Sequence, residues 1–294
     1  MNKRYTPAER ILYIANYIFL IICVIVCLFP FLNVIAVSLS SSRAISSELI
    51  GLLPIEFNFE NYRNLIRDDK IIASAYNSVL VTVVGTFLSI TLTIFAAYPL
   101  SKKRLYKRNA FIMFITFTML FNGGMIPNFI LVKSINLINS YWALWLTGLI
   151  NTFNMIVLKT FFSEIPDSLE EAAALDGAND IYILFKIMVP ISAPAIATIS
   201  LFYAVGFWNM YMPVLIYIND TAKWTMMAKL IQLIQNTAEA LTRPAEGALI
   251  SDTSLTTEGV QTAAIVISTL PILCVYPFLQ KYFVKGVMIG SVKG

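Results

Sequence analysis

The richest group of reactive side chains in this sequence is a cluster of carboxylates within residues 159–186. Six acids stand there against two basic residues: Glu164, Asp167, Glu170, Glu171, Asp176 and Asp180 against Lys159 and Lys186. Surface carboxylates accept charge-assisted hydrogen bonds from basic residues of a partner, so this cluster can form a docking site. The alternative is a solvated interfacial helix without a partner, and spacing alone favours that alternative.

Few other residues suit catalysis. The sequence has 0 His, which excludes Ser-His-Asp and Cys-His catalysis and His-ligated metals. Its cysteines (Cys23, Cys27 and Cys274) lie in apolar runs, where a thiol usually packs as a small hydrophobic group. The phosphate-binding pattern G-x-x-x-x-G-K-[ST] does not occur. We therefore predict that the chain is not an enzyme and holds no metal, nucleotide or other cofactor itself.

Two short helices are predicted to position the carboxylates. Asp167 and Glu170 have the spacing of a capping box, the residues between Glu170 and Gly177 favour a helix, and Gly177 fits the position after the C-cap. Asp180 is expected to cap a second helix, and Pro190 to restrict the chain at a membrane boundary. The apolar residues of that second helix share one face: Ile183, Leu184, Ile187 and Met188. The segment therefore predicts a rigid elbow that a partner can hold.

The composition predicts that this elbow projects from a membrane. The chain of 294 residues is 58% hydrophobic and 13% charged, with a mean hydropathy of +0.74, which is more apolar surface than a water-soluble domain can bury. Stretches without Asp, Glu, Lys or Arg that exceed the roughly 18 residues of a membrane helix occur at 11–42, 71–101, 109–132, 134–158, 187–219 and 259–280. We predict an all-α integral membrane protein with six transmembrane helices.

Charge distribution sets the predicted orientation. The first apolar window is far longer than a signal-peptide core, so we expect a retained helix with a cytoplasmic N-terminus. Alternation of sides then places residues 102–108 inside, where the loop carries five basic residues and no acid. The inside segments hold 13 Lys and Arg and the outside segments 8. Both termini are predicted cytoplasmic, and the acidic elbow lies inside between spans 4 and 5.

The stretch from residue 109 to residue 158 must turn back, because an unbroken helix of that length would measure about 75 Å. Three breaks are possible, and the sequence leaves the choice open: Asn122-Gly123-Gly124, Pro127, and the segment 133–140. Residues 43–70 and 220–258 are predicted as external loops, neither of which has a domain-sized core.

A fixed pattern in the elbow resembles a known motif. Glu171-Ala172-Ala173, three residues, Gly177, nine residues and then Ile187-Met188-Val189-Pro190 resemble the EAA motif of ATP-binding-cassette (ABC) importer permeases, EAA-x3-G-x9-I-x-LP, with Val189 in place of Leu. Phe207-Trp208-Asn209 resembles the carbohydrate branch of these permeases, which includes the maltose permease subunits such as MalG. The tail from Tyr276 to Gly294 is most similar to the LplC/YtcP-type subgroup.

This resemblance implies a type I ABC importer fold, with residues 71–294 as the transmembrane domain and 1–70 as the N-terminal tail, first span and external loop. It implies that the EAA loop, 164–190, forms a coupling helix seated on a cytoplasmic ATPase. Small alanines permit close approach to the ATPase, and glycine permits the tight turn. The residues at the matching positions are Glu170, Glu171, Ala172, Ala173, Asp176, Gly177, Ile187 and Pro190.

The resemblance also implies partners. These are a second, non-identical permease subunit, two ATPase subunits that bind ATP and Mg and perform hydrolysis, and an extracytoplasmic solute-binding protein. The substrate would be an oligosaccharide or a polysaccharide fragment, and no nucleic acid is expected to bind. The chain would be a multi-pass subunit in contact with the lipid of the bacterial cytoplasmic membrane.

Polar residues at membrane depth are candidates for the substrate pathway, because they usually face protein or water. Aromatic faces pack on sugar rings and amides bind hydroxyls. The alternative role of each residue, as an interhelical hydrogen bond or an interfacial anchor, is equally consistent with the sequence. The candidates are Asn77, Asn151, Asn154, Trp208, Asn209 and Tyr211.

Two other classes of membrane protein compete with this interpretation. An intramembrane hydrolase or acyltransferase would need a nucleophile with a base, or paired carboxylates, yet no carboxylate lies within the six windows. An ion-coupled transporter or a channel would normally hold an intramembrane charge or repeated halves, and neither is present in the sequence. Dependence on ATP rather than on an ion gradient separates the last class from an ABC importer.

Overall fold

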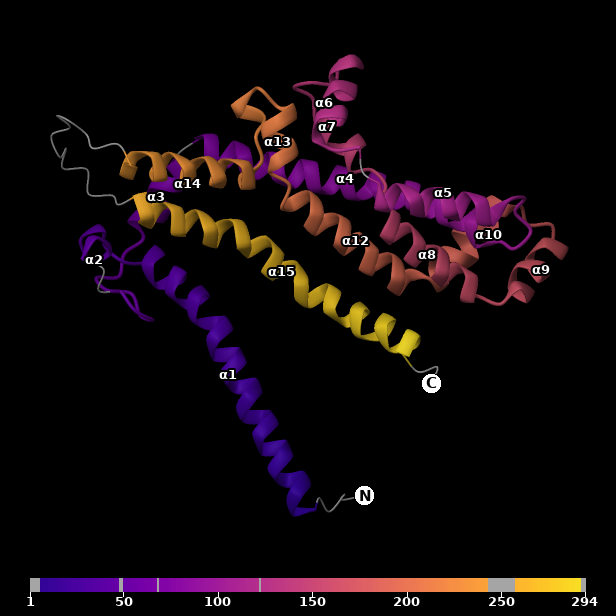
Figure 1. Ribbon diagram of the computed structural model, residues 1–294, viewed down its shortest axis with the longest axis horizontal. Coiled ribbons are helices and arrows are strands. Elements are labelled where there is room, and N and C mark those ends of the chain that lie inside the picture. Colours follow the sequence, from indigo (N-terminus) through magenta and orange to yellow (C-terminus); the bar gives the residue numbers. More distant parts are fainter. Residues whose placement is uncertain (1–5, 48–49, 68, 122, 243–256, 292–294) are drawn as a thin grey trace. The chain divides into compact units, whose positions relative to one another are not determined.

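The computed structural model describes residues 6–47, 50–67, 69–121, 123–242 and 257–291, and within these ranges every regular element is a helix (Figure 1). The chain divides into two compact units. Unit 1 comprises Met1–Asp69 with Gln232–Thr269, and unit 2 comprises Lys70–Ile231 with Leu270–Gly294. The predicted boundary between an N-terminal region, 1–70, and a transmembrane domain, 71–294, stays a prediction.

Unit 1 is built around a long N-terminal helix, α1 (Pro7–Ser38), which begins at a capping box of Thr6 and Glu9. Its side chains are almost all exposed until Ala36, so its apolar surface is available to lipid or to protein. The short helices α2 (Ser42–Ser46) and α3 (Glu60–Arg67) follow it. Asn61 lies on α3, and its buried amide joins this helix to the end of α1 by donating to the carbonyl oxygens of Ser38 (3.2 Å) and Ser40 (3.3 Å).

Unit 2 contains the predicted elbow. Its first helix, α4 (Asp69–Ser101), is followed by α5 (Arg108–Leu120), α6 (Met125–Ser134), α7 (Tyr141–Thr147), α8 (Thr152–Glu164), α9 (Asp167–Leu175), α10 (Asp180–Ile183), a π-helix (Leu184–Met188), α11 (Val189–Ile191), α12 (Ala193–Trp208) and α13 (Met212–Tyr217). The helices α14 (Met226–Thr242) and α15 (Thr257–Ser291) each begin in one unit and end in the other. The core of unit 2 contains fully buried Leu144, Leu158, Phe162, Met188 and Ile199.

Three helical segments are long and apolar enough to cross a membrane: Glu9–Ser38, Asp69–Ser101 and Glu258–Val275. Three further segments qualify only as bent pairs: Arg108–Leu120 with Met125–Ser134 (110°), Tyr141–Thr147 with Thr152–Glu164 (53°), and Asp180–Ile191 with Ala193–Trp208 (84°). The count therefore reaches six if each bent pair crosses as one span. The chain has several apolar helices, as a multi-pass membrane protein requires.

Two of the three breaks considered between residues 109 and 158 are present, because α5 ends at Leu120 before α6 begins at Met125, and α6 ends at Ser134 before α7 begins at Tyr141. Pro127 lies inside α6, whereas Asn136 and Asn139 adopt positive φ angles (56° and 63°) where the chain reverses between α6 and α7. An additional break separates α7 from α8 at residues 148–151, in an apolar stretch that the sequence predicted as one span. Asn151 caps α8 there, and this capping role is not evident from apolar length alone.

The second predicted loop is also more regular than the sequence indicated. The helix α14 covers Met226–Thr242, and α15 begins at Thr257, so much of 220–258 is helical. The amphipathic character of α14 explains the difference, because polar residues on one face interrupt the apolar run without interrupting the helix. Residues 243–256 lie outside the described residues.

Candidate functional site

The elbow begins at α9, and its N-terminus differs from the prediction. Pro166 occupies the N-cap position and Asp167 is the first helical residue, so the predicted capping box of Asp167 and Glu170 is wrong. The extended conformation of Pro166 (φ −59°, ψ 130°) shifts the start of the helix by one residue. Asp167 still lies in the first turn, where a carboxylate stabilises the helix dipole.

The C-terminus of α9 has the glycine turn that the sequence predicts. Gly177 adopts a φ of +86°, a conformation that strains any residue with a Cβ atom. The N–H of Gly177 donates to the carbonyl oxygen of Ala174 (3.0 Å), and the N–H of Ala178 donates to that of Ala173 (3.0 Å). These two bonds form a Schellman motif, which ends α9 and fixes the direction in which the chain leaves it.

The second helix of the elbow is capped by Asn179 rather than by Asp180. The Asn179 side chain accepts a hydrogen bond from the N–H of Tyr182 (2.8 Å), and Asp180 becomes the first helical residue. The predicted apolar face is present, because Ile183, Leu184 and Met188 are 3%, 2% and 0% exposed. A π-helical turn then precedes Pro190, which has no N–H to donate. Beyond it the chain bends by 84° into α12.

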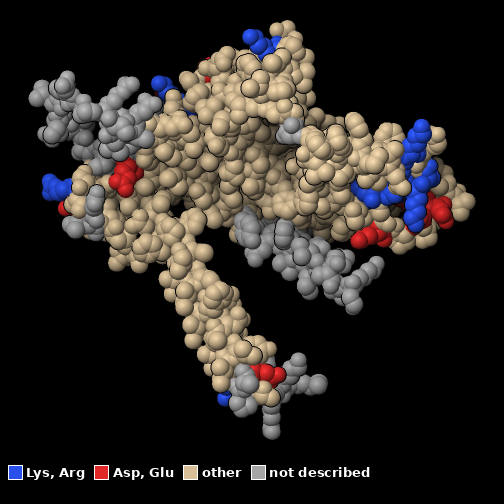
Figure 2. Space-filling view, in the orientation of Figure 1, with Lys and Arg blue, Asp and Glu red and all other residues tan. Residues whose placement is uncertain are grey.

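The carboxylates of the elbow face basic residues that follow α4. Lys102 forms an ion pair with Glu170, and Arg104 forms one with Asp180 (2.8 Å). A pocket of about 290 Å³ lies between the two segments, and its charged lining residues are Lys102, Lys103, Arg104, Asp167, Glu170, Glu171 and Asp180. Figure 2 shows Lys and Arg beside Asp and Glu at the end of unit 2 that carries α9 and α10. Burial lowers the pKa of the Lys102 ammonium, and Asp167 opposes that shift.

These ion pairs change the interpretation of the acidic cluster. Glu170 lies in an internal pair and is 13% exposed, so it is not a free surface carboxylate. Sequence reasoning did not find Lys102 and Arg104, although five basic residues in one predicted inside loop and six acids in another were a signal for pairing. The exposed carboxylates of the motif are those of Glu171 and Asp176.

The outer surface of α9 is partly apolar. Ala172 is exposed, whereas Ala173 is half-buried against the core of unit 2. Leu169 and Leu175 are 45% and 89% exposed, and neither was predicted as part of the site. An exposed leucine beside a glycine turn is a surface that a protein partner can cover.

The asparagines that were predicted to lie at membrane depth make hydrogen bonds within unit 2. Asn151 accepts the N–H of Asn154 on its side chain (3.1 Å), and its own N–H donates to the hydroxyl of Tyr203 (2.9 Å). That hydroxyl also bonds the hydroxyl of Thr93 on α4 (2.7 Å). Asn77 donates to the carbonyl oxygens of Ala222 (2.8 Å) and Trp224 (3.1 Å). Tyr203 was not predicted, since a tyrosine in an apolar run gives no sign of its partners.

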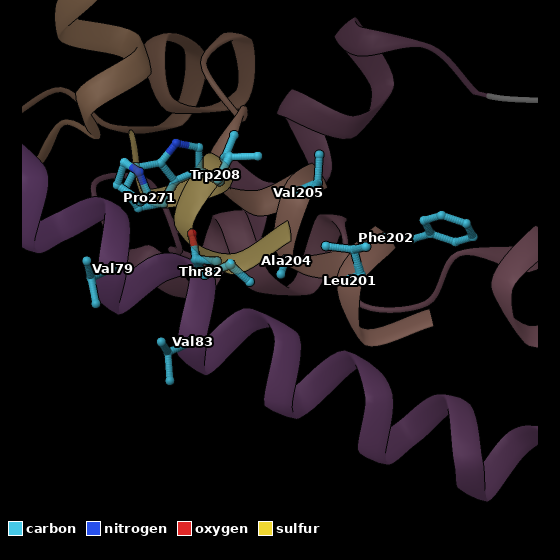
Figure 3. Close-up of a pocket in the computed structure, with 11 residues that line it drawn as sticks. Val79, Thr82, Val83, Leu201, Phe202, Ala204, Val205, Trp208 and Pro271 are labelled. Atoms are coloured by element: carbon cyan, nitrogen blue, oxygen red, sulfur yellow. The ribbon is translucent and has the colours of Figure 1, made fainter. Parts of the chain in front are cut away.

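The other pathway candidates lie near the C-terminus of α12. Trp208 is 8% exposed, whereas Asn209 and Tyr211 are exposed. Trp208 lines an apolar pocket of about 580 Å³, to which α4 contributes Val79, Thr82 and Val83 (Figure 3). Of the six candidates for the substrate pathway, Trp208 alone lines this pocket. The structure therefore does not bring Asn77, Asn151, Asn154, Asn209 and Tyr211 to it.

Comparison with known proteins identifies the family to which the chain belongs. Residues 89–289 match the family model described as the inner membrane component of binding-protein-dependent transport systems. The chain belongs to this family of ABC permeases. That membership confirms the resemblance carried by the EAA motif, and it identifies the chain as a transport subunit of a membrane protein complex rather than a catalytic one.

Individual members of the family match over nearly the whole chain. The polygalacturonan/rhamnogalacturonan transport system permease YtcP of Bacillus subtilis is 46% identical, over 95% of this chain and 96% of that protein. LplC of the same organism is 40% identical, over 98% and 97% of the two chains. The predicted LplC/YtcP-type subgroup is therefore confirmed.

A solved structure supports the fold of this permease. The crystal structure of a bacterial ABC transporter that imports the acidic polysaccharide alginate contains a chain with a TM-score of 0.85 and 33% identity. The match covers 95% of this chain and 99% of that one. The all-helical type I importer fold is thus shared.

Proposed function

We propose that the chain is one of two non-identical permease subunits of an ATP-driven importer, and that it crosses the bacterial cytoplasmic membrane six times with both termini inside. The observation that carries this proposal is the exposed elbow of α9 and α10, which presents the EAA residues on a rigid turn. Leu169 and Leu175 are 45% and 89% exposed on the same helix as the exposed Glu171, which gives the elbow a mixed apolar and acidic surface that a partner protein can cover.

The elbow would act as the coupling helix. The exposed side chains of α9 would lie in a groove of a cytoplasmic ATPase, with Glu171 and Asp176 accepting hydrogen bonds from basic residues there. Two ATPase subunits would bind ATP and Mg and close on each other during the cycle. Closure would push α9, and the continuous path through α10 and α11 into α12 would move the membrane helices.

Carbohydrate is the proposed cargo, delivered by an extracytoplasmic solute-binding protein. YtcP is named for polygalacturonan and rhamnogalacturonan, and the similar solved transporter imports alginate, so fragments of acidic polysaccharides are the first substrates to test. Asn151, Asn154, Trp208, Asn209 and Tyr211 remain our proposed pathway residues. Asn151, Asn209 and Tyr211 are the best placed of these for contact with a sugar because all three are exposed.

The proposal is tested by purifying the tagged chain in detergent after expression with its neighbouring genes. Wild type is compared with a Glu171→Lys, Gly177→Pro double variant. Wild type should retain an ATPase and a second permease and show vanadate-sensitive ATP hydrolysis, and the variant should lose the ATPase while still inserting in the membrane. Recovery of wild type alone, or with partners that the double substitution does not affect, would remove the coupling role.

Uptake by the reconstituted complex separates this proposal from an ion-coupled carrier. Liposomes that contain the complex and ATP should accumulate oligogalacturonides in the presence of the solute-binding protein. Uptake that follows an ion gradient and ignores ATP would contradict the importer mechanism.

A further inference from the structure

The inner end of α4 is joined to the coupling helix by a part-buried ion pair. Lys102 directly follows the last residue of α4, Ser101, and its ammonium contacts the carboxylate of Glu170 on α9. The side chains of Lys102 and Glu170 are only 11% and 13% exposed. Removal of one partner would leave the other charge in a poorly hydrated site, which is far more costly than breaking a solvated pair.

The second ion pair between the same two segments offers a contrast. Arg104 and Asp180 lie 2.8 Å apart, but their side chains are 70% and 67% exposed. Pairs of this kind are hydrated and screened, and they contribute little to a structure. The two pairs differ mainly in burial, so they serve as test and control for the effect of a fixed contact.

Lys102 is itself held by the membrane helices. Its ammonium lies 4.8 Å from the centre of the Tyr98 ring on α4, a cation–π arrangement. The Tyr98 ring packs edge to face against Phe162 of α8, with centroids 6.3 Å apart, and both residues are buried. Ser163 of α8 also donates a hydrogen bond to the carbonyl oxygen of Ser101 (3.3 Å). These contacts hold Lys102 in position beside Glu170.

We propose that Lys102 is a positioning residue, which clamps the coupling helix to the inner end of α4 so that a movement of α9 is delivered to two membrane helices. One route is covalent, from α9 through α10 and α11 to α12. The other is the Lys102–Glu170 contact, which reaches α4 across 68 residues of sequence. This inference rests on the proposed coupling function.

A clamp of this kind would keep α4 and α12 moving together. The two helices are already joined by the Thr93–Tyr203 hydrogen bond (2.7 Å) and by close contact of Phe207 with Gly85, where a Cβ atom would lie 2.8 Å from the Phe207 ring. A push applied to α12 alone would act against these contacts. A push applied at both inner ends would move the pair as one body.

The test uses the whole complex, with its ATPases, second permease and solute-binding protein, reconstituted in liposomes. The probe is the solute-binding protein saturated with oligogalacturonide, and the readout is the ratio of stimulated to basal ATP hydrolysis. Lys102→Met and Glu170→Gln should each lower this ratio about fivefold or more, as loss of a coupling contact predicts. Lys102→Arg and the control Arg104→Ala should keep it within about twofold of wild type. The swap Lys102→Glu with Glu170→Lys restores the ion pair but not the contact with the Tyr98 ring, so it should recover part of the lost stimulation.

The outcomes are distinct. A wild-type complex without stimulation would count against the proposed importer function and not against the clamp. A stimulated wild type with an equally stimulated Lys102→Met variant, or an Arg104→Ala variant that loses as much as Lys102→Met, would overturn the clamp. If Lys102→Met does not assemble, the charge swap decides the question. A swap that assembles and regains stimulation supports the clamp. A swap that does not regain stimulation, whether or not it assembles, refutes the clamp.

Discussion

Two breaks between helices of unit 2 differ in what surrounds them. At the elbow, residues 176–179 separate two helices, and Glu171 and Leu175 on the preceding helix stay exposed. At residues 148–151 the chain also breaks, but there the N–H of Asn151 donates to the hydroxyl of Tyr203, a buried residue of α12. A break at the surface can present side chains to a partner, whereas a break between apolar helices must find hydrogen-bond partners for its own backbone within the protein.

Glu171→Lys should have the largest effect, and it acts on assembly. Reversing an exposed charge at a protein interface should weaken association with the ATPase by about 2–5 kcal/mol. Co-purification of the ATPase with the permease measures this loss. Glu164→Lys is the matched control, because Glu164 is an exposed acid near the elbow that lies outside the EAA string. Equal losses in both variants would show that net charge, and not the motif, governs docking.

Tyr203→Phe should affect stability rather than docking. Loss of the hydroxyl leaves the Asn151 N–H and the Thr93 hydroxyl without this partner, at a cost of about 1–3 kcal/mol. Thermal unfolding of the purified chain in detergent measures the change. Tyr211→Phe, at a residue that is 37% exposed, should leave the unfolding temperature unchanged. An unchanged unfolding temperature for Tyr203→Phe would mean that the break between α7 and α8 does not depend on this hydroxyl.

Gly177→Ala should cost about 1 kcal/mol, because a residue with a Cβ atom is strained at positive φ. The φ of Gly177 is +86°, and a Cβ atom there would meet no atom within 4 Å, so the cost is conformational rather than steric. Gly206→Ala is the control, since that helical glycine also has open space around it. Thermal unfolding should separate the two, with Gly206→Ala neutral or more stable than wild type. Identical behaviour would indicate that the glycine turn tolerates side chains.

Asn209→Ala should have the smallest effect on stability, within about 0.5 kcal/mol, because Asn209 is exposed at the end of α12. If the residue contacts the sugar, oligogalacturonide uptake by liposomes should fall while the unfolding temperature stays constant. A variant with unchanged uptake would leave Asn209 with no part in the pathway.

The elbow could be predicted in its essentials because its signals are local. Gly177 ends α9 as the sequence indicated, and Ile183, Leu184 and Met188 are buried on one face. The caps were wrong by one residue at both helices, where Pro166 and Asn179 replace Asp167 and Asp180. Neighbouring residues compete closely for a cap, and small differences in backbone conformation decide between them.

The sequence by itself determined that the chain is a membrane protein, and its EAA spacing pointed to the permease family. Both follow from composition and from short-range order, which need no knowledge of the fold. The tertiary structure decided that Glu170 binds Lys102, 68 residues away, and that Asn151 binds Tyr203, 52 residues away. It also decided that Leu175 stays exposed. Such pairings and exposures depend on how distant helices pack, and helical periodicity in the sequence does not predict which helix faces will contact each other.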